Sequence, residues 1–407
     1  MKKESLLGDR GVLLAGMLGL GTALFVACGG GADAGADADD STAGTSASAA
    51  GATTSGDGAA GAATVAAGCD SDPATAENTA AVVAAANTLL DALTAEQKTA
   101  IMYEATLANA EQWSNFPTTF VQRNGVTIGD MSEDAQAAAV ALAEVAAGAT
   151  GGTLLDELRE ADEFLVSDGK ASSTDYGRGL YYFSIHGTPA TDAAWMLQIA
   201  GHHLAYNFTY GGKCTSATPL FDGVEPTTWT DSEGKDHAPL EAQRASVVEL
   251  LTSISELSDA KLSGTFSDLV NGPAGGGPGG GGGDTKFPEQ LSYPTGTTGR
   301  GVNVSSLSTA QVALVKTAIE SWVKNVAEPV STSLLAEYES EEALADTYVG
   351  YAGSADLTTQ TSYFRVDGPR VWIELTVQGG IVYHDRVHYH TIWRDKVADY
   401  GAEYGAP

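Results

Sequence analysis

The sequence predicts an α+β fold, in which amphipathic helices flank an antiparallel sheet within a single domain. Helix-forming and strand-forming segments come in blocks, without the regular strand and helix alternation of parallel sheets. The two strand blocks, 180–209 and 362–393, are rich in aromatic and β-branched residues. Hydrophobic residues make up 43% of the chain, which is enough for a sizeable core.

The predicted helices precede each strand block. Apolar residues recur at helical spacing, and a capping box starting at Thr94 marks a break in the first helical run. Ser132 opens a further run, and the pair Gly151-Gly152 divides it into two helices. The predicted helical segments are 78–113, 132–145, 154–165, 239–257 and 308–336.

The first 28 residues have the pattern of a bacterial lipoprotein signal. A basic start precedes residues 11–27, an uncharged and mostly apolar run that is short for a membrane span. The run ends in Phe-Val-Ala-Cys, which resembles a lipobox. We therefore predict a signal peptide over 1–27, a lipidated Cys28, and anchoring in the bacterial cell envelope, at the outer membrane or cell surface. An ordinary cleaved signal is the alternative.

The composition of residues 28–68 predicts a disordered tether. Beyond Cys28 they contain almost only Ala, Gly, Ser, Thr and Asp, so they cannot bury enough apolar surface to offset their chain entropy. The α+β domain then spans 69–407. Another glycine-rich segment, near 272–285, lacks the motifs of phosphate-binding loops, and we predict a solvated loop there.

The charge of the chain argues against a nucleic-acid partner. Lys and Arg number 21 against 52 Asp and Glu, which gives a formal net charge of −31. Nucleic acids are bound through clustered Lys and Arg, and this chain has few of either. The predicted partner is the membrane, through the N-terminal lipid.

The cysteine count predicts a disulfide. With Cys28 lipidated, Cys69 and Cys214 remain, and an even pair in an oxidising compartment favours a bridge. Two unrelated free thiols are the alternative, because the sequence does not show whether the two side chains can reach each other.

Six of the seven histidines lie in the strand blocks. In the second block, period-two alternation places His384, His388 and His390 on one strand face, and Glu374 on the matching face of the preceding strand. A three-residue turn around Gly379 would pair the strands so that Glu374 neighbours these imidazoles.

In the first block, the apolar positions change phase at Gly201. A glycine within a strand at a change of phase predicts a bulge, which re-aims side chains. The alternation then places His203 and Asn207 on the polar side and turns His202 towards the apolar side.

Three motifs of the two blocks are similar to those of domain-of-unknown-function family 3500, whose members are mostly secreted. The motifs are YYFSIHGTPATDAAWMLQIAGHHLAYNFTY, YFRVDGPRVWIEL and HYHTIWRDKVADYG. The resemblance covers about Cys69 to Gly401. It implies a shared fold and shared polar residues, and it implies no particular reaction.

The predicted site is a metal site. His203, His388, His390 and Glu374 would be a sufficient ligand set for zinc or another divalent transition metal. Six further residues are candidates for orienting the ligands or binding a substrate: His202, Asn207, His384, Arg394, Asp395 and Asp399. The alternative is a polar seam of histidines that bond to one another.

Two function classes remain open. The chain lacks a GxSxG motif, and Cys214 is better used in a disulfide, so a serine or cysteine hydrolase is not predicted. The first class is a metal-dependent envelope hydrolase with a histidine-rich site. The second is a surface-tethered binding or interaction protein without catalysis.

Overall fold

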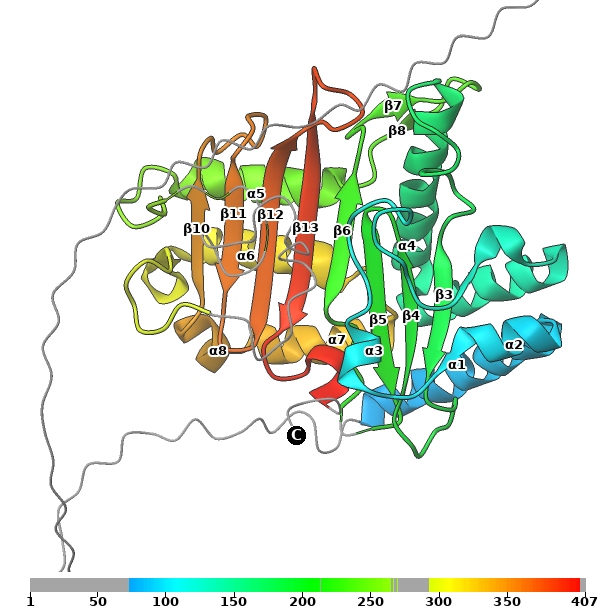
Figure 1. Ribbon diagram of the computed structural model, residues 1–407. Coiled ribbons are helices and arrows are strands. Elements are labelled where there is room, and N and C mark those ends of the chain that lie inside the picture. The colour runs from blue at the N-terminus through cyan, green and yellow to red at the C-terminus, as the bar shows by residue number, and fades with distance from the viewer. Residues whose placement is uncertain (1–72, 213, 265, 267–268, 270–292, 403–407) are drawn as a thin grey trace, which may run out of the picture. The chain divides into compact units, whose positions relative to one another are not determined.

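The computed structural model describes residues 73–212, 214–264, 266, 269 and 293–402, and it confirms the α+β prediction (Figure 1). One large sheet has the strand order β1-β3-β4-β5-β6-β13-β12-β11-β10-β9, with β2 beside β3. All of its pairings are antiparallel except that of β1 with β3. The predicted signal peptide, the tether and the glycine-rich loop near 272–285 lie outside the described residues.

The strands of this sheet are β1 Met102–Tyr103, β2 Val126–Thr127, β3 Tyr182–His186, β4 Trp195–Gly201, β5 Leu204–Tyr210, β6 Leu220–Val224, β9 Val302–Asn303, β10 Tyr348–Ala352, β11 Tyr363–Asp367, β12 Val371–Gly379 and β13 Val387–Asp395. A separate hairpin consists of β7 Trp229–Thr230 and β8 Asp236–His237. Strand β6 lies outside both predicted strand blocks, and it joins them by pairing with β5 on one side and with β13 on the other.

The helices are α1 Pro73–Ala92, α2 Ala95–Ile101, α3 Leu107–Ala110, α4 Glu133–Ser167, α5 Glu241–Ile254, α6 Thr309–Val323, α7 Glu328–Tyr338 and α8 Glu341–Ala345. Helices α1, α4, α5, α6 and α7 contribute to the main apolar core, against one face of the sheet (Figure 1). The predicted capping box is confirmed, since Thr94 and Gln97 cap α2 reciprocally.

Helix α4 differs from its prediction in where it bends. The sequence suggested a break at Gly151-Gly152, but the chain kinks at Gly148, whose φ of 72° favours glycine. Gly151 instead allows a close approach, because a Cβ there would lie 2.0 Å from the Asn325 carbonyl oxygen. By length and composition α4 could also cross a membrane, and 44% of its most apolar window is buried in the protein.

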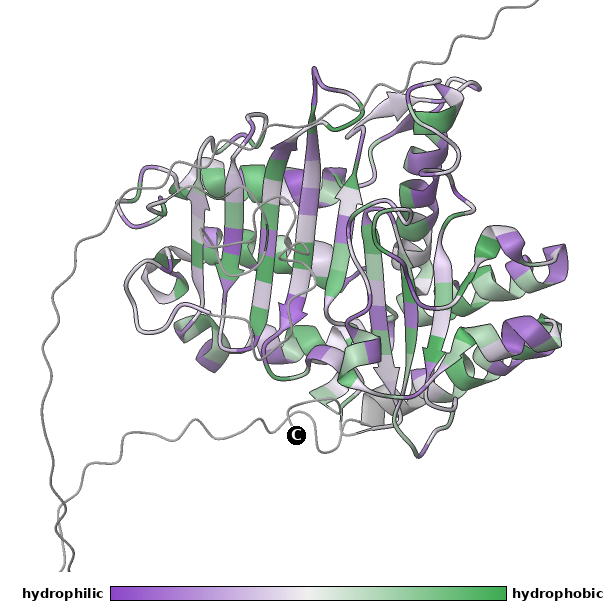
Figure 2. Ribbon diagram, in the orientation of Figure 1, coloured by the Kyte–Doolittle hydropathy of each residue, from purple (hydrophilic) through white to green (hydrophobic). Residues whose placement is uncertain are grey.

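The second face of the sheet carries a smaller apolar cluster. It contains Trp113, Ala205, Phe221 and Ile392, among others. Because neighbouring side chains along a strand alternate between the faces, His388 and His390 share this face with Ile392. Figure 2 shows the alternation of polar and apolar residues along these central strands.

The predicted three-residue turn between β12 and β13 is wrong. Gly379 pairs with Val387, so residues 380–386 form a loop instead of extending the strands. The Glu225 carboxylate accepts hydrogen bonds from three successive backbone N–H groups of this loop, at 2.8 to 3.2 Å. His384 therefore lies on an exposed loop and not on the strand.

Candidate metal centre

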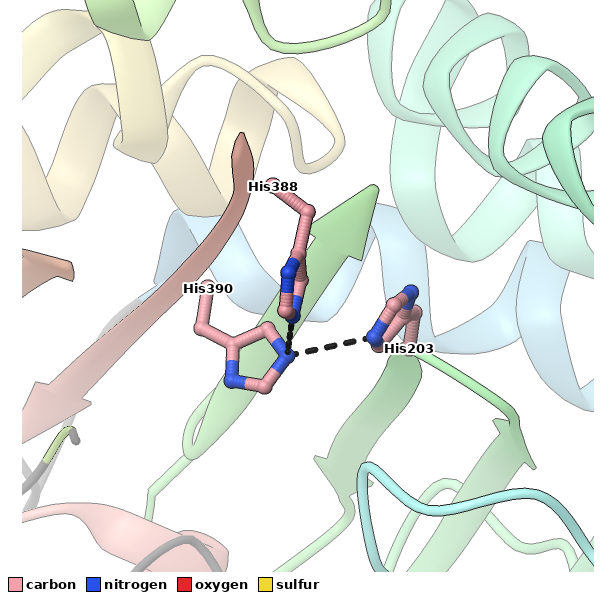
Figure 3. Close-up of side chains that lie close together, drawn as sticks. All are labelled: His203, His388 and His390. Carbon is pink, nitrogen blue, oxygen red and sulfur yellow. Dashed lines mark hydrogen bonds between the residues drawn. The ribbon is translucent and has the colours of Figure 1, made fainter. Parts of the chain in front are cut away.

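Three of the predicted ligands, His203, His388 and His390, converge on the second face of the sheet. The Nε2 atom of His390 lies 3.1 Å from Nε2 of His388 and 3.1 Å from Nε2 of His203 (Figure 3). One ring nitrogen from each residue lies within 4.8 Å of the others. The structure thus brings together imidazoles that are up to 187 residues apart in the sequence.

A tight turn positions His203. Gly201 pairs with Leu204, so His202 and His203 form a two-residue hairpin turn between β4 and β5. This turn replaces the predicted bulge and explains the change of phase, because a two-residue turn pairs odd positions with even ones. The φ of 60° at His203 places its backbone in the left-handed region, which is uncommon for a residue other than glycine.

Gly223 makes room for the imidazoles. It lies on β6 opposite His390, and its backbone N–H donates to the His203 carbonyl at 2.7 Å. A Cβ at this position would lie 2.9 Å from Cδ2 of His203 and 3.1 Å from Cδ2 of His390. Glycine at this position is therefore required for both imidazoles to pack as they do.

The cluster is buried, and its environment favours the neutral form of His203 and His388. His203, His388 and His390 are 5%, 1% and 4% exposed. Burial lowers the pKa of His203 well below its ordinary value and that of His388 to about 2, and the neighbouring imidazoles act in the same direction. Neutral imidazole is the form that binds a metal ion.

The spacing of the nitrogens suits one tetrahedral ion. Zinc to imidazole bonds of about 2.0 to 2.1 Å at tetrahedral angles hold the nitrogens about 3.3 Å apart. Two of the three nitrogen separations, both 3.1 Å, are close to this value, and the three ligand atoms all lie within 4.8 Å of one another. Three imidazoles also leave one coordination position for a further ligand, as in catalytic zinc sites.

His202 and Asp162 support the cluster from outside. The rings of His202 and His203 stack with centroids 3.7 Å apart, and Nδ1 of His202 lies 2.7 Å from a carboxylate oxygen of Asp162. The Tyr181 hydroxyl donates to the other carboxylate oxygen at 3.2 Å. Sequence reasoning identified His202 but not Asp162, because nothing local distinguishes this acid among the others on helix α4.

The structure does not bring Glu374 to the histidines. Glu374 shares their face of the sheet, as predicted, but it pairs with Ile392, whereas Thr376 pairs with His390. Its carboxylate accepts from the Tyr363 hydroxyl at 2.6 Å and from the Trp372 indole at 2.7 Å. The register that the longer loop imposes separates Glu374 from the cluster.

The remaining candidates make other contacts. Asn207 bonds with Gln198 at 2.8 Å and with the Pro219 carbonyl at 2.7 Å. Arg394 and Asp399 form a buried ion pair at 2.9 Å. The described contacts of Asp395 join the C-terminal end of β13 to helix α7 and to the residues that follow the strand.

The described residues do not include both members of the predicted disulfide. Cys214 is buried, whereas Cys69 and the predicted lipidation site Cys28 lie outside the described part of the chain. The Cys69–Cys214 bridge therefore stays a prediction.

Comparison with known proteins identifies the family. The family described as protein of unknown function, DUF3500, matches residues 75–402. No curated protein and no solved structure matches the chain. The match covers most of the sequence, including all three histidines of the cluster, and the chain belongs to the DUF3500 family.

Proposed function

We propose that this protein binds one divalent transition metal ion, best suited to zinc, through His203, His388 and His390. The observation that carries the proposal is the convergence of their three Nε2 atoms, two pairs of which lie 3.1 Å apart. Imidazole ligands suit zinc, copper, iron and nickel, and tetrahedral coordination with an open position is typical of catalytic zinc.

Hydrolysis is the reaction that such a centre supports best. Zinc held by three imidazoles lowers the pKa of a water molecule at its open position to about 7, so that hydroxide is available near neutral pH. The protein would supply the ligand geometry. His202, which stacks on His203 and contacts Asp162, would help to hold the His203 imidazole in place.

A second candidate is a metal-binding protein without catalysis. The three side chains are 1 to 5% exposed, so a substrate has little direct access to them in this conformation. This burial is the specific observation that favours metal storage, sensing or a structural ion over turnover.

A hydrolysis assay separates the two candidates. The purified protein, with and without one equivalent of zinc, would be tested against nitrophenyl acetate, nitrophenyl phosphate and a casein digest. For the hydrolase we expect a rate that requires zinc and that falls to the buffer rate in His390→Ala. Stoichiometric zinc without turnover of any substrate would support the second candidate.

We also propose that the protein is anchored to the bacterial cell envelope by acylation of Cys28, as the pattern of residues 1–28 suggests. A lipid chain contributes about 0.8 kcal/mol of membrane binding per buried methylene group. Replacing Cys28 by alanine is therefore expected to move most of the protein from the membrane fraction to the soluble fraction. Unchanged membrane association after a carbonate wash would contradict acylation as the anchor.

A further inference from the structure

We infer that Asn115 is a positioning residue of the metal centre, which selects the tautomer of His390 that can bind the ion. The inference rests on the proposed metal site and adds a residue from a distant segment. Asn115 lies between α3 and β2, two residues after Trp113 of the apolar cluster on the second face of the sheet.

Two contacts connect Asn115 to two different ligands. Its side-chain amide Nδ2 lies 3.4 Å from Nδ1 of His390. Its backbone carbonyl accepts a hydrogen bond from the His203 N–H at 3.2 Å. Asn115 is only 5% exposed, so these contacts form away from bulk water, where polar partners matter most. One residue thus links the β4–β5 turn to β13.

The tautomer follows from the geometry. A neutral imidazole carries one proton, and the Nε2 of His390 faces the other two Nε2 atoms. To bind a metal through Nε2, His390 must carry its proton on Nδ1, where a nearby acceptor stabilises it. One group that the structure places beside Nδ1 is the Asn115 amide.

An amide can serve both tautomers. With Nδ2 towards His390, as here, Asn115 donates to Nδ1 and favours a proton on Nε2. Rotation of the amide by 180° would place Oδ1 towards Nδ1 and favour the metal-binding form. The Oδ1 atom is buried without a hydrogen-bond partner among the described residues, so the rotation breaks no hydrogen bond of that oxygen. We therefore infer that the amide turns when the ion binds.

Two substitutions test the inference. Leucine at position 115 has nearly the same shape and no polar atom, so we expect Asn115→Leu to weaken zinc binding about 10- to 100-fold, as losses of outer-shell partners do. An aspartate carboxylate can accept a hydrogen bond from a proton on Nδ1 of His390 but cannot donate one. We therefore expect Asn115→Asp to bind zinc as tightly as the wild type or more tightly. Affinity would be measured by competition with a chromophoric zinc chelator.

Asn325→Leu is the matched control. Asn325 is also 5% exposed, but its amide donates to the Ser321 carbonyl in the helical layer. We expect this variant to lose stability and to keep its zinc affinity. Comparable weakening in Asn325→Leu and Asn115→Leu would assign the effect to general destabilisation and overturn the inference.

Nitrogen NMR of the zinc-loaded wild type gives a readout that needs no variant. We expect His390 to carry its proton on Nδ1 and that proton to exchange slowly with water, and we expect faster exchange in Asn115→Leu. If the wild type binds zinc tightly, and if Asn115→Leu keeps both that affinity and the slow exchange of the His390 Nδ1 proton, the role of Asn115 is overturned while the proposed metal site stands. Failure of the wild type to bind zinc would instead overturn the proposed function.

Discussion

Replacing His390 with alanine is expected to abolish stoichiometric zinc binding. The Nε2 atom of His390 is the common neighbour of the other two imidazoles, at 3.1 Å from each, so its loss leaves two ligands that do not complete a site. We expect the affinity to fall by more than about 100-fold, the upper range for the loss of an outer-shell partner. Competition with a chelator, together with the zinc to protein ratio after dialysis, measures this.

His384→Ala is the control for this variant. His384 is the same residue type six positions earlier, but it lies exposed on the loop between β12 and β13. We expect its replacement to leave zinc binding unchanged. Equal losses in both variants would mean that zinc binds outside the buried cluster.

Replacing Asp395 with alanine is expected to cause a large loss of stability. This carboxylate is 1% exposed and accepts from Arg370 at 2.7 Å, from the Tyr338 hydroxyl at 2.8 Å and from two backbone N–H groups that follow β13. Its removal leaves the Arg370 guanidinium, which is 14% exposed, with the more exposed Glu337 at 3.7 Å, so the charge loses its closer and better buried partner. We expect the free energy of unfolding in urea to fall by about 3 to 5 kcal/mol.

An exposed ion pair and the metal centre provide two controls for Asp395→Ala. Glu160 pairs with Arg178 at 2.7 Å on the surface, and Glu160→Ala should cost less than about 1 kcal/mol. The zinc affinity of folded Asp395→Ala should match that of the wild type. Weaker zinc binding at unchanged stability would place Asp395 in the metal site.

Local sequence signals predicted much of the fold. Blocks of helical and strand patterns predicted the α+β class, and Thr94 with Gln97 predicted the cap of α2. Period-two alternation placed His388 and His390 on one face of a strand, where the structure has them. These features depend on neighbouring residues, which is why one sequence suffices to predict them.

The register of β12 and β13 depends on a distant residue. The backbone of loop 380–386 is held by Glu225, which lies more than 150 residues earlier in the chain. Counting residues around Gly379 therefore gave a turn that was too short, and it placed Glu374 too close to the histidines. A one-step change in register moves every cross-strand neighbour.

Tertiary structure also supplies the residues that sequence reasoning missed. Asp162 reaches His202 from helix α4, and Asn115 reaches His390 from a segment without regular secondary structure. Neither residue belongs to a motif or to a periodic pattern with the histidines. The two-residue turn at His202-His203 had a local signal, the change of phase at Gly201, which fits a turn as well as it fits a bulge.

Native mass spectrometry of the purified protein, after loading with excess zinc and removal of weakly bound ions, tests the metal centre most directly. We expect one zinc ion per chain in the wild type and none in the variant with alanine at positions 203, 388 and 390, when circular dichroism shows that both are folded. A folded wild type without bound zinc, copper, iron or nickel would contradict the proposed metal centre. A triple variant that keeps its ion would contradict it as well.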